Sequence, residues 1–158
     1  MRVLLLSLLF LCVACSPEGS VDSPLDPRMP PVVDGEVTIQ YHPGGFINNI
    51  WQTFMDFDSR SIMVRVTGGC YSACTMAIAE QLRLNCTTWT GSYHFHGAAI
   101  RTFGRVIEVD DRTTVMWHVY PKEVQDALPP PEEWVSTKWN VLSSRELNAV
   151  QGRKYRSC

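Results

Sequence analysis

Apolar residues in the first half of the chain follow two periodicities, one typical of strands and the other of helices. Residues 36–41 alternate between polar and apolar positions, and residues 61–67 are apolar enough to form a buried strand. Between them, an apolar face with helical spacing predicts an amphipathic helix, followed by a turn over residues 56–60. The face consists of Phe46, Ile47, Ile50, Trp51, Phe54 and Met55.

A second unit of the same kind follows. Gly68-Gly69 is expected to end the second strand, residues 72–84 are expected to form a helix, and residues 87–95 predict a third strand. Strand–turn–helix units of this length imply parallel strands joined by right-handed crossovers. We therefore expect an α/β fold, a single small domain whose mainly parallel sheet is built from βα units.

The second half of the chain has weaker patterns. Helical stretches in residues 112–128 are interrupted by a proline, and residues 131–140 have the proline and acidic residues that start a helix. Ser143 and Glu146 form a capping box, which predicts a last helix through Val150.

The N-terminal segment has the pattern of an export signal. Arg2 is the only charge in the first fifteen residues, and residues 3–13 are almost entirely apolar but too short to span a bilayer. Residues 12–15, Cys-Val-Ala-Cys, resemble the lipobox of bacterial lipoproteins, although Cys12 stands where leucine is usual. We therefore expect export to the bacterial cell envelope with a lipid anchor at Cys15, ahead of an ordinary cleaved signal or a retained anchor.

Composition divides the rest of the chain into a tether and a domain. Residues 16–31 are rich in proline, with Gly, Ser and Asp between, and cannot bury enough apolar surface to fold alone. Residues 32–158 leave room for one core. The net charge of −2 gives no indication of a nucleic-acid partner.

Four cysteines remain once the two in the signal are set aside, namely Cys70, Cys74, Cys86 and Cys158. In an oxidising compartment they allow up to two disulfides. Cys74 would face back from the first helical turn and Cys86 follows that helix, so one of Cys70 or Cys74 is expected to pair with Cys86. Cys158 would take the remaining partner or stay free. This use of cysteine disfavours a zinc site at His94 and His96, and no metal or cofactor is expected.

Both strand–helix turns are glycine-rich, and open parallel sheets place their sites at such turns. Gly44 and Gly45 can expose backbone N–H groups in the first turn. The second turn brings Ser72 to a helix N-terminus, where unpaired N–H groups, including that of Ala73, favour developing negative charge. A serine there, with His96 following the next strand, is a candidate nucleophile and base. The alternative role of Ser72 is a helix N-cap.

Four segments in this order resemble the ClpP/crotonase superfamily, and more closely a group of exported ClpP-like bacterial proteins of unknown role. Residues 43–45 (Pro-Gly-Gly) are similar to its first oxyanion loop, and residues 69–75 (Gly-Cys-Tyr-Ser-Ala-Cys-Thr) to its nucleophile turn. Residues 95–98 (Phe-His-Gly-Ala) are similar to the segment with the catalytic histidine. Residues 142–147 (Leu-Ser-Ser-Arg-Glu-Leu) are similar to the start of a late helix.

The resemblance implies a serine hydrolase, in the first place a peptidase, with Ser72 as nucleophile and His96 as general base. Gly44, Gly45 and Ala73 would form the oxyanion hole, and the substrate would be a peptide or protein at the cell envelope. Coenzyme A chemistry ranks last, because acyl-CoA is cytoplasmic.

The residue that would orient the histidine is missing from its expected place. In the ClpP branch an aspartate precedes the leucine-serine pair, and Trp139 occupies the aligned position here. Asn140 is a candidate substitute. Asp110, Asp111 and Asp126 are further candidates; otherwise the site is a Ser–His dyad or is inactive. The alternative function is therefore a catalytically inactive module that binds a protein partner at the envelope.

Overall fold

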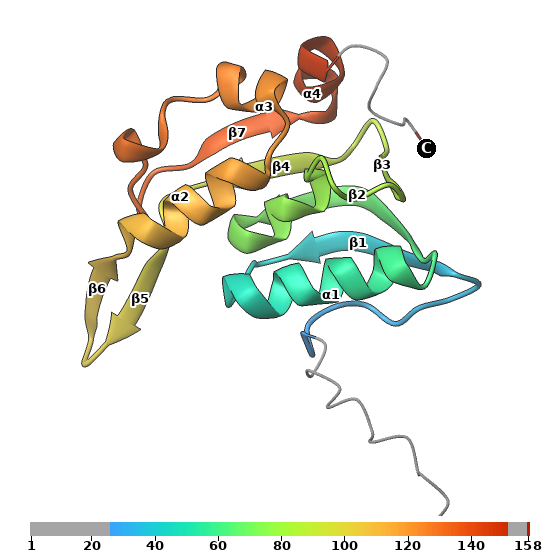
Figure 1. The fold of residues 1–158 in the computed structure, drawn as a ribbon, viewed down its shortest axis with the longest axis horizontal. Helices are drawn as coiled ribbons and strands as arrows, with labels where there is room; N and C mark the ends of the chain where they lie inside the picture. The colour runs from blue at the N-terminus through green and yellow to red at the C-terminus, as the bar shows by residue number, and fades with distance from the viewer. Residues whose placement is uncertain (1–25, 152–157) are drawn as a thin grey trace, which may run out of the picture.

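A computed structural model of the chain describes residues 26–151 and residue 158. The expected signal peptide, the lipidation site Cys15 and most of the expected tether lie outside the described residues. The described part is a small α/β domain with a mixed, mostly parallel five-stranded sheet and a separate two-stranded hairpin (Figure 1). The predicted fold class is thus confirmed at this level.

The main sheet has the strand order β1-β2-β4-β7, and β3 also pairs with β2. β1, β3 and β4 run parallel to β2, whereas β7 runs antiparallel to β4. Tyr71 at the end of β2 is in register with His94 of β4, which brings the ends of these two strands side by side. The strands are β1 (Glu36–His42), β2 (Met63–Tyr71), β3 (Asn85–Thr87), β4 (Ser92–Phe95) and β7 (Asn140–Ser143).

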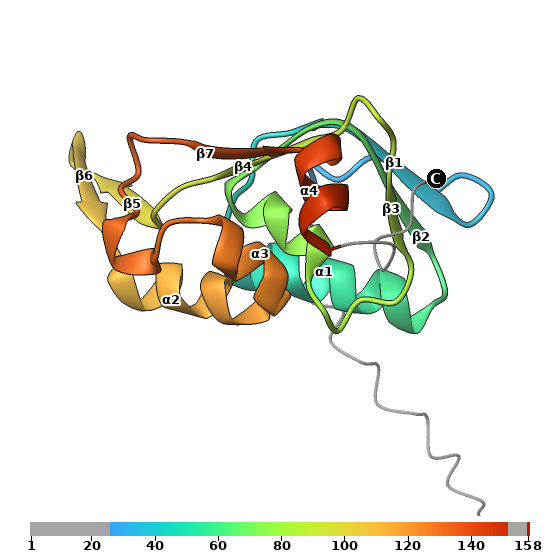
Figure 2. The same ribbon diagram turned by 90° about the horizontal axis from the view of Figure 1, so that it is seen from above.

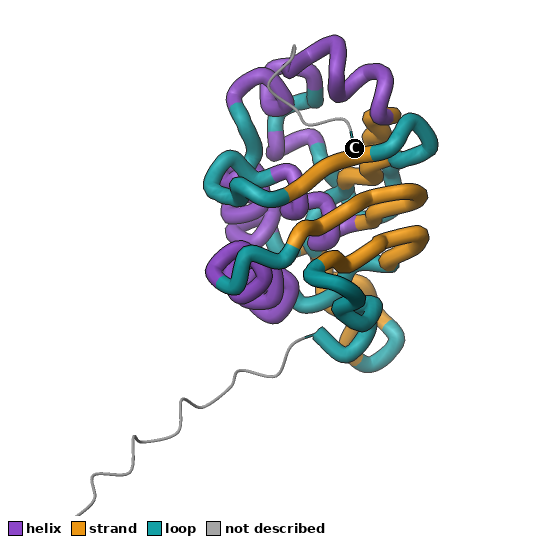
Figure 3. Tube along the Cα trace, turned by 90° about the vertical axis from the view of Figure 1, so that its right-hand side faces the viewer, coloured by secondary structure: helices purple, strands orange, loops and turns teal. Residues whose placement is uncertain are grey.

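The helices cover one face of the sheet, as Figures 2 and 3 show. Their apolar sides pack against the inward side chains of β1 and β2 to form the core. The hairpin, β5 (Ala99–Thr102) and β6 (Arg105–Glu108), projects at one end. The helices are α1 (Ile47–Ser59), the 3₁₀ helix η1 (Ser72–Ile78), α2 (Asp110–Val119), α3 (Lys122–Ala127), the 3₁₀ helix η2 (Pro131–Glu133) and α4 (Ser144–Gln151).

Helix α1 confirms the predicted amphipathic helix and extends it. Ile50 and Phe54 are buried as expected, whereas Phe46 and Met55, predicted for the same face, are exposed. The helix also runs through the segment predicted as a turn and ends at Ser59. Phe57 is also buried, so the apolar stripe continues for one more turn and holds that turn on the sheet.

Strand β2 is longer than predicted because its glycines continue the strand. A Cβ at position 68 would lie 2.0 Å from the carbonyl oxygen of Gln40 in β1, so glycine permits the close approach of the two strands. The helix predicted over residues 72–84 is instead the short η1. Its residues 73–78 are all buried, which leaves no polar face for an amphipathic helix.

Other predictions were partly wrong. The third strand is divided into β3 and β4, the helix expected in residues 131–140 is only η2, and β5, β6 and β7 were not predicted. The capping box is confirmed, because the N–H and Oγ of Ser143 donate to Oε2 of Glu146 at 2.8 and 2.7 Å. These hydrogen bonds lower the pKa of Glu146. Within residues 26–151, no helix combines the length and apolarity needed to cross a bilayer.

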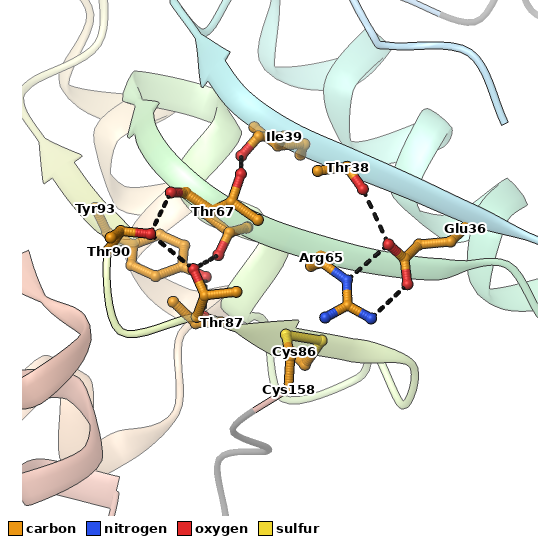
Figure 4. Close-up of a disulfide and its surroundings, with 12 residues drawn as sticks. Glu36, Thr38, Ile39, Arg65, Thr67, Cys86, Thr87, Thr90, Tyr93 and Cys158 are labelled. Carbon is orange, nitrogen blue, oxygen red and sulfur yellow. Dashed lines mark hydrogen bonds and ion pairs between the residues drawn. A yellow bond between two sulfur atoms is a disulfide. The ribbon is translucent and has the colours of Figure 1, made fainter. Parts of the chain in front are cut away.

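The predicted disulfide pairing was wrong. Cys70 is joined to Cys74, and Cys86 is joined to Cys158 (Figure 4). The turn between β2 and η1 folds back so tightly that the Cα atoms of Cys70 and Cys74 lie 5.3 Å apart, within the usual range for a disulfide. The second bridge fixes residue 158 to β3, beside the neighbouring strands that carry the Glu36–Arg65 ion pair.

Candidate functional site

Ser72 occupies a sharp turn between β2 and η1. Its φ is +53°, in the left-handed region that residues with a side chain rarely adopt. The disulfide between Cys70 and Cys74 spans this turn. A strained, disulfide-clamped serine is more than a helix N-cap requires, and Tyr71 rather than Ser72 holds the N-cap position of η1, so the N-cap alternative is wrong.

The two glycine-rich turns meet at this serine. Gly44 has a φ of +82°, and a Cβ added to it would lie 2.5 Å from both the Cβ of Ser72 and the carbonyl oxygen of Tyr71. The same point is 3.1 Å from the backbone nitrogen of Ala73. The turn after β1 therefore packs its backbone directly on the serine turn, as the sequence predicted from their places at the strand ends.

One of the three N–H groups expected at the oxyanion site already has a hydrogen-bond acceptor. The N–H of Gly44 donates to Nδ1 of His42 at 3.1 Å and is therefore already used. Among the described residues, no hydrogen bond uses the N–H of Gly45 or of Ala73. These two N–H groups are therefore available to a ligand at the serine turn.

His42 was not identified from the sequence. It is the last residue of β1, is fully buried, and its Nε2 has no hydrogen-bond partner among the described residues. Because Nδ1 accepts a hydrogen bond, the ring is neutral, and burial lowers the pKa of His42. Its place directly before Pro43-Gly44 was the only signal that it supports the glycine turn.

His96 directly follows β4, next to the strand end that carries Ser72. In the described structure no hydrogen bond joins the Ser72 and His96 side chains, and Nδ1 of His96 is buried without a partner. Burial lowers the pKa of His96, and a hydrogen bond with the backbone of Gly97, together with the charge of Glu108, offsets part of that effect. The lowered pKa favours the neutral imidazole that a base requires, although Nδ1 has no partner among the described residues.

None of the residues considered from the sequence as the orienting group has a hydrogen bond to His96 in the described structure. Trp139 packs its ring against the imidazole edge, with centroids 4.3 Å apart, and Asn140 pairs with Phe95 in the sheet. Asp126 is paired with Lys122. Asp110 and Asp111 lie in the first turn of α2.

Glu108 is an acid near His96 that the sequence analysis missed. Both of its carboxylate oxygens accept from the N–H of Ser136, at 3.0 and 3.1 Å, and Oε1 also accepts from Oγ of Ser136 at 2.6 Å. The segment around Ser136 also bonds to the residue after the histidine, since the N–H of Gly97 donates to the carbonyl of Val135. The charge of Glu108 raises the pKa of His96, and no hydrogen bond joins the two side chains in the described structure.

His94 belongs to a neighbouring aromatic cluster. Its ring stacks on Tyr71 with centroids 4.1 Å apart, accepts or donates a hydrogen bond with Ser92, and meets Trp139 edge-on. No group of three or more His, Cys, Asp or Glu side chains in the described chain is arranged to hold a metal ion.

Comparison with known proteins adds little. No protein-family model and no curated protein sequence matches the chain. A solved structure described as "Crystal structure of an Enzyme" is similar over 66% of this chain, with 11% sequence identity and a TM-score of 0.40. The match spans 62% of that structure's length, which is less than two thirds.

The buried histidines predict a pH dependence of stability. His42 and His96 have lowered pKa values in the folded protein, so below about pH 6.5 the unfolded chain binds protons that the folded chain does not. The free energy of unfolding is expected to fall as the pH drops from 7.5 to 5, measured by urea denaturation. His42→Gln should reduce this slope, whereas the exposed His118→Gln is the matched control. An equal slope in wild type and His42→Gln would contradict the assignment.

Proposed function

We propose that this chain is a serine hydrolase of the ClpP/crotonase type that cleaves peptides at the bacterial cell envelope. Ser72 is the nucleophile, His96 is the general base, and the N–H groups of Gly45 and Ala73 hold the oxyanion. The observation that carries the proposal is the left-handed backbone of Ser72 at the end of β2, with the Gly44 turn packed on its Cβ. Strain of this kind concentrates at functional sites.

In the proposed reaction, His96 takes the proton of Ser72 Oγ as that oxygen attacks the substrate carbonyl carbon. The carbonyl electron pair moves to oxygen, where the two N–H groups stabilise the charge. His96 then gives its proton to the departing amine nitrogen as the C–N bond breaks, leaving an acyl-serine. Water, deprotonated by His96, attacks the acyl carbon, and the Ser72 oxygen leaves and recovers the proton.

The location is part of the proposal and is supported by the disulfides. Two bridges in one small domain are characteristic of proteins in oxidising compartments, as expected for an exported chain. An anchor at Cys15 would hold the domain at a membrane surface. The substrates available there are peptides and proteins of the cell envelope.

One observation favours the alternative, a catalytically inactive module that binds a protein partner. The buried Nδ1 of His96 has no acceptor among the described residues, and the neighbour packed against the ring is Trp139, which has no carboxylate to offer. A histidine whose ring is not held in one orientation and one tautomer is a poor general base.

A fluorophosphonate probe distinguishes the two functions, because it reacts only with an activated serine. We expect labelling of the wild-type domain, none of Ser72→Ala, and labelling about 10² to 10⁴ times slower for His96→Ala. Ser59→Ala, an exposed serine at the far end of α1, is the control and should label like wild type. Absence of labelling in a folded wild-type domain would rule out the hydrolase and support the binding module.

A further inference from the structure

The segment before β1 is attached to the domain through a buried carboxylate. Asp26 is 3% exposed, and its N–H donates to Oγ1 of Thr53 in α1 at 3.0 Å. The sequence placed residues 26–31 in an extended tether, but Asp26 and Arg28 pack against the domain. The attachment thus consists of the buried Asp26 side chain and the hydrogen bond from the Asp26 N–H to α1.

Asp26 fixes the side chain of Arg28 as a planar fork. Nε of Arg28 donates to Oδ1 of Asp26 at 2.9 Å, and Nη2 donates to Oδ2 at 2.5 Å. The backbone N–H of Arg28 also donates to Oδ1 at 2.9 Å. These contacts lower the pKa of Asp26 and raise that of Arg28. Both groups are therefore charged, and the guanidinium is held in one orientation.

The fixed guanidinium lies on the glycine turn beside Ser72. A Cβ added to Gly45 would lie 1.6 Å from Nη2 of Arg28 and 2.5 Å from its Cζ. The guanidinium thus occupies the space that a side chain at position 45 would fill. It stands next to one of the two free N–H groups assigned to the oxyanion.

The outer edge of the guanidinium is available to a ligand. Asp26 uses only Nε and Nη2, and the Arg28 side chain is 43% exposed. Helix α1 has no acidic residue in its first turn, and Arg112 reaches that turn through a hydrogen bond to Asn48. Nothing negative in this turn opposes an incoming carboxylate, whose geometry matches the guanidinium fork.

We propose that Arg28 recognises a carboxylate on the substrate, close to the carbonyl that Ser72 attacks. The proposal rests on the function proposed above and narrows its substrates to peptides with an acidic side chain or a free C-terminus beside the scissile bond. Because Asp26 already orients the guanidinium, little further ordering is needed on binding. Arg28 is then a specificity-determining residue, and Gly45 is the glycine that admits it to the turn.

The test compares two fluorophosphonate probes, one ending in a carboxylate and the other in its methyl ester. In the wild type the carboxylate probe should label Ser72 about tenfold faster or more, as a charge-assisted hydrogen bond implies. In Arg28→Gln the ratio of the two labelling rates, carboxylate probe to methyl ester probe, should fall to about one. Arg83→Gln should keep it, since Arg83 also pairs with an aspartate, Asp58, but at the other end of α1.

Two additions keep the test decisive. The Asp26→Asn/Arg28→Gln double variant removes both charges, so that no unpaired carboxylate is buried, and it should also lose the ratio. The Ser72→Ala domain is titrated with an acidic peptide, with the same peptide ending in an amide, and with one lacking acidic side chains, which separates the two sources of the carboxylate. Tighter binding of the carboxylate forms should again require Arg28.

The outcomes separate the two proposals. Equal labelling by both probes, or a ratio that survives in both Arg28 variants, overturns the role of Arg28 and leaves the hydrolase intact. No labelling by either probe overturns the hydrolase. If Ser72→Ala then still prefers carboxylates through Arg28, the anion site stands alone; if it does not, both proposals fail.

Discussion

Gly44→Ala is expected to abolish labelling of Ser72 and to lower the free energy of unfolding by about 3 kcal/mol or more. The left-handed φ of +82° alone costs a residue with a Cβ about 1–2 kcal/mol. The new methyl group would also lie 2.5 Å from the carbonyl oxygen of Tyr71, and backbone cannot turn away as a side chain can. The two turns would be forced apart, and the oxyanion donors would move with them.

Gly35→Ala provides the matched control for this substitution. Gly35 also has a left-handed φ, +77°, but a Cβ there would meet nothing within 4 Å. Gly35→Ala should therefore lower the free energy of unfolding only by the conformational part, about 1–2 kcal/mol, and leave labelling unchanged. Urea denaturation and fluorophosphonate labelling measure both effects. Equal losses of stability in the two variants would show that the close contact between the Gly44 turn and the Ser72 turn does not contribute to stability.

Removal of the Cys86–Cys158 bridge should be the most damaging change outside the site. Its cysteines are 72 positions apart, and opening so long a loop in the unfolded chain costs about 4 kcal/mol of stability. The Cys70–Cys74 bridge closes a loop of only 4 positions, for which the same relation gives about 2 kcal/mol.

Paired serine variants test this difference. Cys86→Ser/Cys158→Ser should show the larger decrease in the free energy of unfolding, measured by urea denaturation. It should still be labelled at Ser72 at urea concentrations below the midpoint of its own unfolding transition. Cys70→Ser/Cys74→Ser should lose less stability and more labelling, because its bridge spans the Ser72 turn. The reverse pattern would mean that the short bridge is structural and does not shape the site.

The sequence predicted those parts of the fold that follow from neighbouring residues. The periodicity of Ile50 and Phe54 predicted α1, and the Ser143–Glu146 spacing predicted the cap of α4. The two glycine turns were predicted to lie together because parallel strands place their C-terminal ends at one edge.

What escaped prediction depends either on an unusual local backbone conformation or on a contact between distant segments. The pairing of Cys70 with Cys74 follows from the left-handed backbone at Ser72, which no local pattern encodes. The contact of Arg28 with Gly45 requires α1 to bury Asp26 first. This second contact forms only once α1 has packed on the sheet.

The short bridge at the serine turn also governs the order in which the cysteines oxidise. Cys70 and Cys74 belong to one turn and meet as soon as it forms, whereas Cys86 must await a partner 72 positions away. Loop closure is much more probable over the shorter distance. Once the nearby pair has closed, Cys86 and Cys158 are left to find each other. We therefore expect the turn that presents Ser72 to disfavour mispaired products, including the Cys70–Cys86 and Cys74–Cys86 pairs that helical spacing would suggest.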